Sequence, residues 1–196
     1  MNRKISYNIV ITIYFVVSIV LLSGCTSNTS NNNSNGQSWL ENYTPVHSVG
    51  NGEDDFWTVY PDINPNASQP VSHLSWVVDS LEENCVVFVV HKTGCETCQP
   101  QADRVLSLGE KYEDSLVCYD LDLTLGGDTE QKGYDAYIYD PVGPPGYIAL
   151  TGIFTLVEKN GKVEYGWHSW EGDVPKSEIE TWVKDGIYYY NMNGEK

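Results

Sequence analysis

The chain has 196 residues and a formal net charge of −16 at pH 7, with 27 Asp and Glu residues against 11 Lys and Arg residues. This acidic excess argues against nucleic acid as a partner, because phosphates need a basic surface, and against adsorption to anionic lipid headgroups. Only 19% of the residues are charged, and many are Tyr, Trp, Asn or Gly, a composition that suits an exported protein.

The N-terminus has the pattern of an export signal. A short basic start at residues 2–4 precedes a nearly apolar run over residues 9–22. A membrane-spanning helix needs about 20 apolar residues, so this shorter run favours the h-region of a signal peptide. The run ends in Leu22-Ser23-Gly24-Cys25, which resembles the lipobox of prokaryotic lipoproteins and implies cleavage before Cys25 and a lipid on that residue. An uncleaved signal anchor is the alternative, because the run approaches spanning length when it is extended back to Ile5.

Both alternatives place the body of the chain outside the cytoplasm and attach it to the cell membrane. Residues 1–24 are the predicted signal peptide, and residues 25–38 are almost wholly Ser, Asn, Thr and Gly, which predicts a flexible tether. Residues 39–69 contain Pro, Gly and several aromatic residues that we expect to pack on the domain formed by residues 70–196. The aromatic residues of this extension are Trp39, Phe56, Trp57 and Tyr60.

The regular elements begin with a helix and a buried strand. Apolar residues recur at intervals of three and four, which predicts a helix over residues 70–83. Residues 85–91 are rich in β-branched residues and apolar on both faces, as in a central parallel strand. The sequence Gly94-Cys95-Glu96-Thr97-Cys98 follows, and a second helical pattern then runs to about Tyr112 with Pro100 in its first turn.

The second half of the chain predicts further strands and helices, with Asn160-Gly161 as a strong hairpin signal between two strands. The predicted elements are a strand over 115–123, a weaker helix over 129–139, strands over 152–158 and 162–167, and a final helix over 175–188.

Cys95 and Cys98 form a CxxC pair at a strand-to-helix junction, which is a recognised redox signature. A thiolate at a helix N-terminus is stabilised by unpaired N–H groups and by the helix dipole, which can lower a cysteine pKa from about 8.5 to roughly 3.5 to 7.5. We therefore expect a redox-active pair. A structural disulfide and half of a metal site are the alternatives.

The other cysteines leave more than one pairing open. If Cys25 carries a lipid, four cysteines remain, an even number that permits full pairing. With Cys95 joined to Cys98, a second disulfide could link Cys85 to Cys118, although free buried cysteines are also common. The four could instead form a tetrahedral zinc site, but the second CxxC that is usual for such sites is missing. We expect no metal and no other cofactor.

The order of these elements around the CxxC resembles the thioredoxin fold. Cys95 and Cys98 take the place of the family's active-site pair, and Gly152–Lys162 is similar to its Gly-Ile-Pro-Thr strand and the following turn. The resemblance covers roughly residues 70–190. It implies an α/β fold in which helices cover both faces of a mixed central sheet, as a three-layer α/β/α sandwich.

The resemblance also implies a mechanism. Cys95, at the exposed first position, would attack a substrate disulfide as a thiolate, and Cys98 would resolve the mixed disulfide. Glu96 should raise the pKa of the attacking thiol, whereas Lys92, His91 and the helix dipole should lower it. The simpler interpretation of His91 is a polar strand end that points into solvent.

Three positions depart from the family pattern. Gly94 replaces an aromatic residue, and Val89 stands where a buried acid would accept the proton of the resolving thiol. The cis-proline that faces the disulfide corresponds to Phe154, or to Ile153 if the register slips by one. A cis bond before a residue other than proline costs about 2.5 to 4 kcal/mol, so we expect a trans peptide at Phe154.

The predicted function is that of a membrane-tethered, extracytoplasmic thiol-disulfide oxidoreductase, which uses Cys95 and Cys98. Its partners would be exported protein disulfides or a redox relay protein. The alternative is a non-catalytic thioredoxin-like binding module, in which the CxxC disulfide is structural and Trp167, His168 and Trp170 line a binding surface.

Overall fold

The computed structural model describes residues 39–194. The predicted signal peptide, the lipid on Cys25 and the tether of residues 25–38 lie outside the described residues. Between residues 39 and 194 there is no helix with the length and apolar character needed to cross a membrane.

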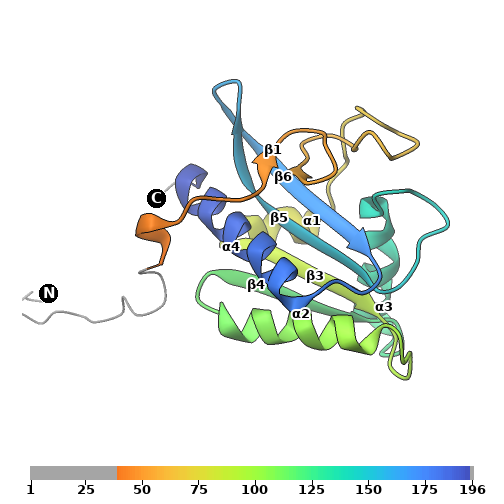
Figure 1. The fold of residues 1–196 in the computed structure, drawn as a ribbon. Helices are drawn as coiled ribbons and strands as arrows, with labels where there is room; N and C mark the ends of the chain where they lie inside the picture. The colour runs from red at the N-terminus through yellow and green to blue at the C-terminus, as the bar shows by residue number, and fades with distance from the viewer. Residues whose placement is uncertain (1–38, 195–196) are drawn as a thin grey trace, which may run out of the picture. The chain divides into compact units, whose positions relative to one another are not determined.

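A four-stranded mixed sheet forms the centre of the described chain (Figure 1). Its strands, in spatial order, are β4 (Leu116–Asp122), β3 (Cys85–His91), β5 (Leu150–Lys159) and β6 (Lys162–Glu171). Strand β3 runs parallel to β4 and antiparallel to β5, and β5 pairs with β6 as a hairpin. All seven residues of β3 are buried, which explains why its sequence is apolar on both faces.

Helices cover both faces of this sheet (Figure 1). On one face lie α2 (Gln99–Lys111) and α4 (Lys176–Asn193), whose apolar residues share a core cluster with the sheet. On the other face lie α1 (Ser75–Leu81), α3 (Gly127–Asp135) and the 3-10 turn η2 (Ala136–Tyr139), around a second cluster. The predicted thioredoxin-like α/β/α sandwich with a mixed central sheet is therefore confirmed.

The predicted hairpin is confirmed, and its strands are longer than the sequence indicated. Asn160 and Gly161 form the turn with φ values of 54° and 75°, the left-handed conformation that Asn-Gly favours in two-residue hairpins. The predicted helix over residues 70–83 is shorter than expected and begins only at Ser75. Leu74 is extended, with ψ at 137°, and its N–H donates to the Tyr139 hydroxyl, so the helix does not continue back to Pro70.

The segment 39–69 packs closely against the sheet and α4. It contains the 3-10 turn η1 (Leu40–Asn42) and two short parallel strands, β1 (Ser48–Val49) and β2 (Asp55–Phe56). Trp57 then pairs with Trp167 of β6 through two backbone hydrogen bonds of 2.7 and 2.9 Å. This pairing covers part of an edge strand that would otherwise expose unpaired backbone groups.

Asp185 of α4 anchors the same segment. It is fully buried, and its carboxylate accepts hydrogen bonds from the Tyr43 hydroxyl at 2.5 Å, from the His47 amide at 2.8 Å and from His47 Nδ1 at 2.7 Å. Burial and this hydrogen bond raise the pKa of Tyr43 well above its usual range.

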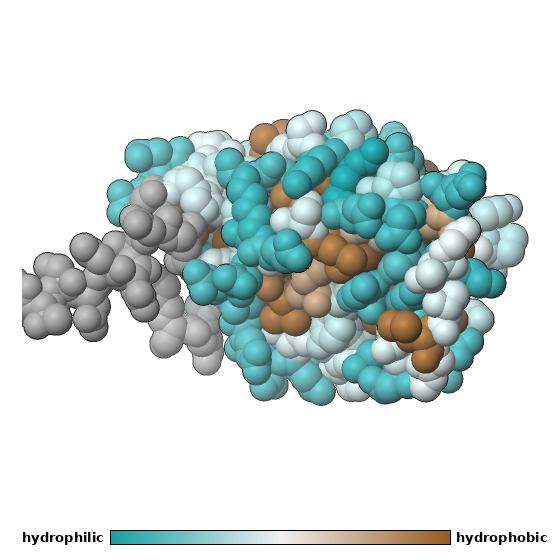
Figure 2. All heavy atoms as spheres, turned by 90° about the horizontal axis from the view of Figure 1, so that it is seen from below, coloured by the Kyte–Doolittle hydropathy of each residue, from teal (hydrophilic) through white to brown (hydrophobic). Residues whose placement is uncertain are grey.

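Figure 2 shows one face of the molecule, on which hydrophilic residues predominate around a smaller group of hydrophobic ones. This agrees with the solvated exterior that the composition indicates.

Candidate functional site

A disulfide joins Cys95 to Cys98 in the turn between β3 and α2. The amide of Cys98 donates to the Cys95 carbonyl at 3.1 Å, and Cys98 is the residue directly before the first turn of α2, which contains Pro100. Cys95 is partly exposed, whereas Cys98 is fully buried. Of the two sulfurs, only that of Cys95 is therefore open to attack from solvent.

Asp122 supports the loop that leads to this disulfide. It lies at the end of β4 in register with His91 and is buried. Its carboxylate accepts hydrogen bonds from the amide and hydroxyl of Thr93, two residues before Cys95, and from the amide and hydroxyl of Thr124. Burial by itself would raise the pKa of Asp122, but these hydrogen bonds outweigh it and hold the pKa below its usual range.

Sequence reasoning missed Asp122, although a signal was present. The carboxyl ends of adjacent parallel strands meet at the same edge of a sheet. An aspartate at the end of the second strand is therefore expected beside the loop that follows the first.

His91 does not point into solvent, so this part of the prediction is wrong. The side chain is buried, and its Nε2 lies 2.6 Å from Asp120 Oδ1 of the neighbouring strand. Its Nδ1 is buried without a hydrogen-bond partner among residues 39–194. Because side chains alternate along a strand, His91 lies on the same face of β3 as Val89, which belongs to the core cluster of Cys98. Lys92, by contrast, is exposed.

The other proposed tuning residue, Glu96, lies between the two cysteines and is exposed. Thr97, beside it, places its hydroxyl 3.4 Å from Cys95 Sγ. Thr97 was not singled out from the sequence.

Phe154 does not face the Cys95–Cys98 disulfide, as the family's cis-proline would. It lies in the middle of β5, and its ring packs in the cluster beneath α1, on the face of the sheet opposite to Cys98. Its peptide bond is trans, as expected. Cis bonds instead join Pro144 to Pro145 and Ile148 to Ala149, and Ala149 shares the core cluster of Cys98 directly before β5.

Cys85 and Cys118 are both free, so the second disulfide that the sequence left open is not formed. Cys85 pairs in register with Leu116 and lies against Gly186 of α4, where its Sγ donates to the Phe154 carbonyl at 3.2 Å. Cys118 lies on β4 two residues after Leu116, and it packs against Gly109 of α2.

The chemistry of these two thiols is that of core residues. Burial raises the pKa of Cys118 to about 12 and that of Cys85 still further, so both stay protonated and unreactive near neutral pH. Within the part of the chain that the structure describes, no three or more His, Cys, Asp or Glu side chains are grouped so as to hold a metal ion.

The three residues suggested for a binding surface separate into two environments. Trp167 is fully buried in the core, on the face of β6 toward α1. His168 and Trp170 both line a surface pocket on the other face of β6.

No protein-family model matches the sequence, and no curated protein matches it. Among the solved structures that are similar to this chain are three with low sequence identity and low TM-scores. The thioredoxin Deadhead of Drosophila melanogaster has 14% sequence identity and a TM-score of 0.35, over 54% of this chain and 84% of that chain. Thioredoxin O2 of Arabidopsis thaliana, in its oxidised state, has 15% identity and a TM-score of 0.35, over 55% and 84%.

The third structure concerns thiol resolution in the yeast mitochondrial 1-Cys peroxiredoxin through glutathione and thioredoxin systems. It has 13% identity and a TM-score of 0.37, over 58% of this chain and 91% of that chain. Similarity at this level says nothing about substrates or partners, so the function of this chain has to be inferred from its own residues.

Proposed function

We propose that this chain is a membrane-tethered, extracytoplasmic thiol-disulfide oxidoreductase. The observation that carries the proposal is the position of the Cys95–Cys98 disulfide at the start of α2, with Cys95 partly exposed and Cys98 buried. This asymmetry separates the two roles that disulfide exchange needs, because the attacking thiol must reach a substrate while the resolving thiol must be shielded from it.

The exchange proceeds in two steps. The Cys95 thiolate attacks one sulfur of a substrate disulfide, so that a mixed disulfide forms and the other substrate sulfur leaves as a thiolate. Cys98 then attacks Cys95 Sγ, which releases the second substrate thiol and forms the Cys95–Cys98 disulfide. Two electrons pass to the substrate. The reverse sequence oxidises a substrate dithiol.

The proton of Cys98 must be removed before the second step, and Val89 offers no carboxylate for this. We propose that His91, held by Asp120, supplies the base in its place. The support is that His91 is buried four residues before Cys95, on the face of β3 that carries Cys98's cluster, with one ring nitrogen engaged by Asp120 and the other without a partner in the described chain.

Export and tethering rest on residues 1–38 and on their pattern alone. The basic start, the apolar run and the lipobox-like sequence before Cys25 support a lipid anchor on the outer side of the cytoplasmic membrane. In that compartment exported protein disulfides, or a partner that relays electrons, are the substrates available to a tethered dithiol.

A Cys98→Ser variant tests the proposal. It should trap mixed disulfides through Cys95, because the resolving thiol is gone, and these adducts should disappear under reducing conditions on gels. Cys95→Ser is the matched control and should trap none. Absence of trapped species together with absence of insulin reduction by the wild-type chain would contradict the enzymatic proposal.

The reduction potential separates this function from the alternative of a structural CxxC. A working oxidoreductase is expected at about −270 to −120 mV, whereas a structural disulfide is expected below about −300 mV. Equilibration with glutathione or dithiothreitol buffers, followed by alkylation and mass spectrometry, measures it.

A further inference from the structure

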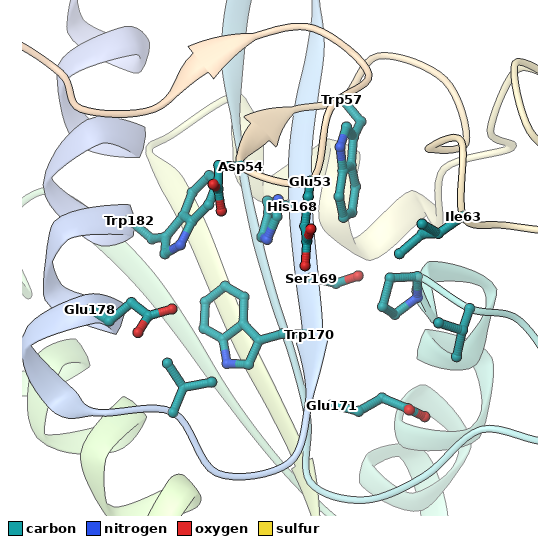
Figure 3. Close-up of a pocket in the computed structure, with 13 residues that line it drawn as sticks. Glu53, Asp54, Trp57, Ile63, His168, Ser169, Trp170, Glu171, Glu178 and Trp182 are labelled. Carbon is teal, nitrogen blue, oxygen red and sulfur yellow. The ribbon is translucent and has the colours of Figure 1, made fainter.

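A pocket with a volume of about 330 Å³ opens beside β6 (Figure 3). Strand β6 contributes His168, Ser169, Trp170 and Glu171 to its wall. The rest of the wall comes from residues 53–63 on both sides of β2, from the start of α4 and the loop before it, and from the segment at residues 141–142. The proposed oxidoreductase mechanism uses none of these residues.

Aromatic rings give the pocket a rigid wall. The imidazole of His168 stacks on Trp182 at 3.8 Å between ring centroids, and His47 stacks on Trp182 at 3.4 Å. Trp57 packs on His168 at 4.2 Å. Because each ring of this stack is held by its neighbours, the wall is ordered before any ligand arrives.

Trp170 is the aromatic residue whose ring is open to a ligand in the pocket. In Figure 3 its indole lies at the centre of the pocket with its face toward the viewer, and Glu53, Glu171 and Glu178 lie around it. Its centroid is 6.3 Å from that of Trp182, so it stands outside the tight stack. Its Nε1 is buried and has no hydrogen-bond partner in the described chain.

The charge of the wall is negative. Four carboxylates line it, those of Glu53, Asp54, Glu171 and Glu178, and no Lys or Arg is among the 13 lining residues. Burial lowers the pKa of His168 to about 3, so its ring is neutral near pH 7 and adds no positive charge. A concave site with one sign of charge attracts the opposite charge from solution.

We propose that this pocket binds a small organic cation of the substituted-ammonium class, seated on the face of Trp170 and surrounded by the carboxylates of Glu53, Asp54 and Glu178. An aromatic face attracts a cation through its quadrupole, and aromatic walls recognise quaternary ammonium groups in this way. The pocket volume suits a ligand of this size. A ligand that carries a phosphate would meet repulsion from the same carboxylates.

Titration of the full-length chain with choline, followed by calorimetry and tryptophan fluorescence, tests this proposal. The uncharged isostere 3,3-dimethyl-1-butanol has the same shape and should bind at least about tenfold more weakly, because it lacks the cation–π and charge attraction. Added NaCl should weaken choline binding. Equal binding of the two compounds, or no saturable binding of choline, would overturn the proposal.

Phosphocholine, which carries the same ammonium group together with a phosphate, tests the charge of the site. It should bind more weakly than choline, because the carboxylates of the wall repel the phosphate. Tighter binding of phosphocholine than of choline would overturn the proposal. Saturable binding of a neutral oligosaccharide in place of choline would overturn the cation site.

Variants locate the binding. Trp170→Leu should weaken choline binding about tenfold, and Glu178→Gln should weaken it several-fold. Glu164→Gln is the matched control, since Glu164 is exposed on β6 outside the pocket and should leave the affinity unchanged. Because Glu178 is exposed, its variant is expected to fold even if Trp170→Leu does not. Unchanged affinity in Glu178→Gln, or an equal loss in Glu164→Gln, would overturn the proposal. Cys95→Ser should bind choline normally, which separates this site from the dithiol.

Discussion

Asp122 shows how a single buried carboxylate can fix the loop beside the Cys95–Cys98 disulfide. Four donors from Thr93 and Thr124 converge on it. Hydrogen bonds to charged groups contribute about 1.5 to 3 kcal/mol each, and a buried group left without its partner costs more than an exposed one. The geometry of the loop before Cys95 therefore depends on a residue of the neighbouring strand.

We predict that Asp122→Asn lowers the free energy of unfolding by about 2 to 3 kcal/mol at pH 7, because an amide offers one acceptor oxygen in place of two. The pKa of Asp122 is lower in the folded chain than in the unfolded one. Its contribution is therefore complete above the unfolded pKa of about 3.9 and is lost as the pH falls toward the folded value. The difference between wild type and variant, measured by urea unfolding, should shrink below about pH 4.

Asp114→Asn is a suitable control because Asp114 is exposed. It should change the stability by no more than about 0.5 kcal/mol at any pH. A difference between wild type and Asp122→Asn that stays constant from neutral to acidic pH would contradict the assigned role of the carboxylate.

His91 leads to a kinetic prediction. If it removes the proton of Cys98, His91→Asn should slow insulin reduction by about 100-fold, the lower end of the range for general-base catalysis. The pH–rate profile of His91→Asn should also differ from that of the wild type, because an asparagine amide cannot act as a general base. Asp120→Asn, which keeps the ring but weakens its hydrogen bond, should have a smaller effect on the rate. A slower His91→Asn variant with an unchanged pH–rate profile would show a structural role only.

At the scale of elements, two helices pack closely against the sheet because each has a glycine where it meets a free cysteine of a strand. A Cβ on Gly109 of α2 would lie 2.6 Å from Cys118 Sγ, and one on Gly186 of α4 would lie 2.8 Å from Cys85 Sγ. Contacts this short require the helix or the cysteine to move. Each free cysteine is therefore a packing residue that fills the space left by the glycine facing it.

We predict that Gly109→Ala destabilises the chain by about 1 to 3 kcal/mol through overpacking, even though alanine favours a helix by about 1 kcal/mol over glycine. The double variant Gly109→Ala/Cys118→Ala should recover part of the loss, because it removes the sulfur that the new methyl group meets but keeps Cys118 Cβ, which also lies 2.6 Å from that methyl position. Thermal and urea unfolding of the single and double variants measure this coupling. Additive effects of the two substitutions would contradict it.

The elements themselves were largely predictable because their signals are local. The apolar run of β3, the Asn160-Gly161 turn and the helical periodicity after Cys98 each specify an element from a few neighbouring residues. The start of α1 was not predictable in the same way. Helix α1 begins at Ser75 because Leu74 is extended, and the Leu74 N–H donates to the hydroxyl of Tyr139, which is distant in sequence.

At the scale of the whole molecule, the segment 39–69 shares its core with the sandwich. Phe56 packs in the cluster of α2 and α4, and Trp57 packs in the cluster of the opposite face. Hydrogen bonds from Tyr43 and His47 to Asp185 hold the start of this segment against α4. The pocket around Trp170 exists only because this segment lies beside β6 and α4.

We predict that Asp185→Asn lowers the free energy of unfolding by about 2 to 4 kcal/mol, because the new amide group places donors against the donors of His47 and Tyr43. Limited proteolysis should cut residues 39–69 of the variant faster than those of the wild type. Asp173→Asn is the control, since Asp173 is exposed and pairs with Arg104 at the surface, where such pairs contribute about 0 to 1 kcal/mol. Equal losses in the two variants would contradict the anchoring role of Asp185.

The sequence by itself determined the order of strands and helices from residue 70 onward and the place of Cys95 and Cys98 between β3 and α2. These features depend on residue periodicity, on turn chemistry and on neighbours within a few positions along the chain.

Only the tertiary structure decided what surrounds the disulfide and which cysteines stay free. In the folded chain Asp120 and Asp122 lie beside the end of β3, and Phe154 packs on the face of the sheet opposite to Cys98. Cys85 and Cys118 form no disulfide. The physical reason is that these neighbours come from strand register and from helix packing. Both bring together residues far apart in sequence, and a shift of one position moves a side chain to the other face of the sheet.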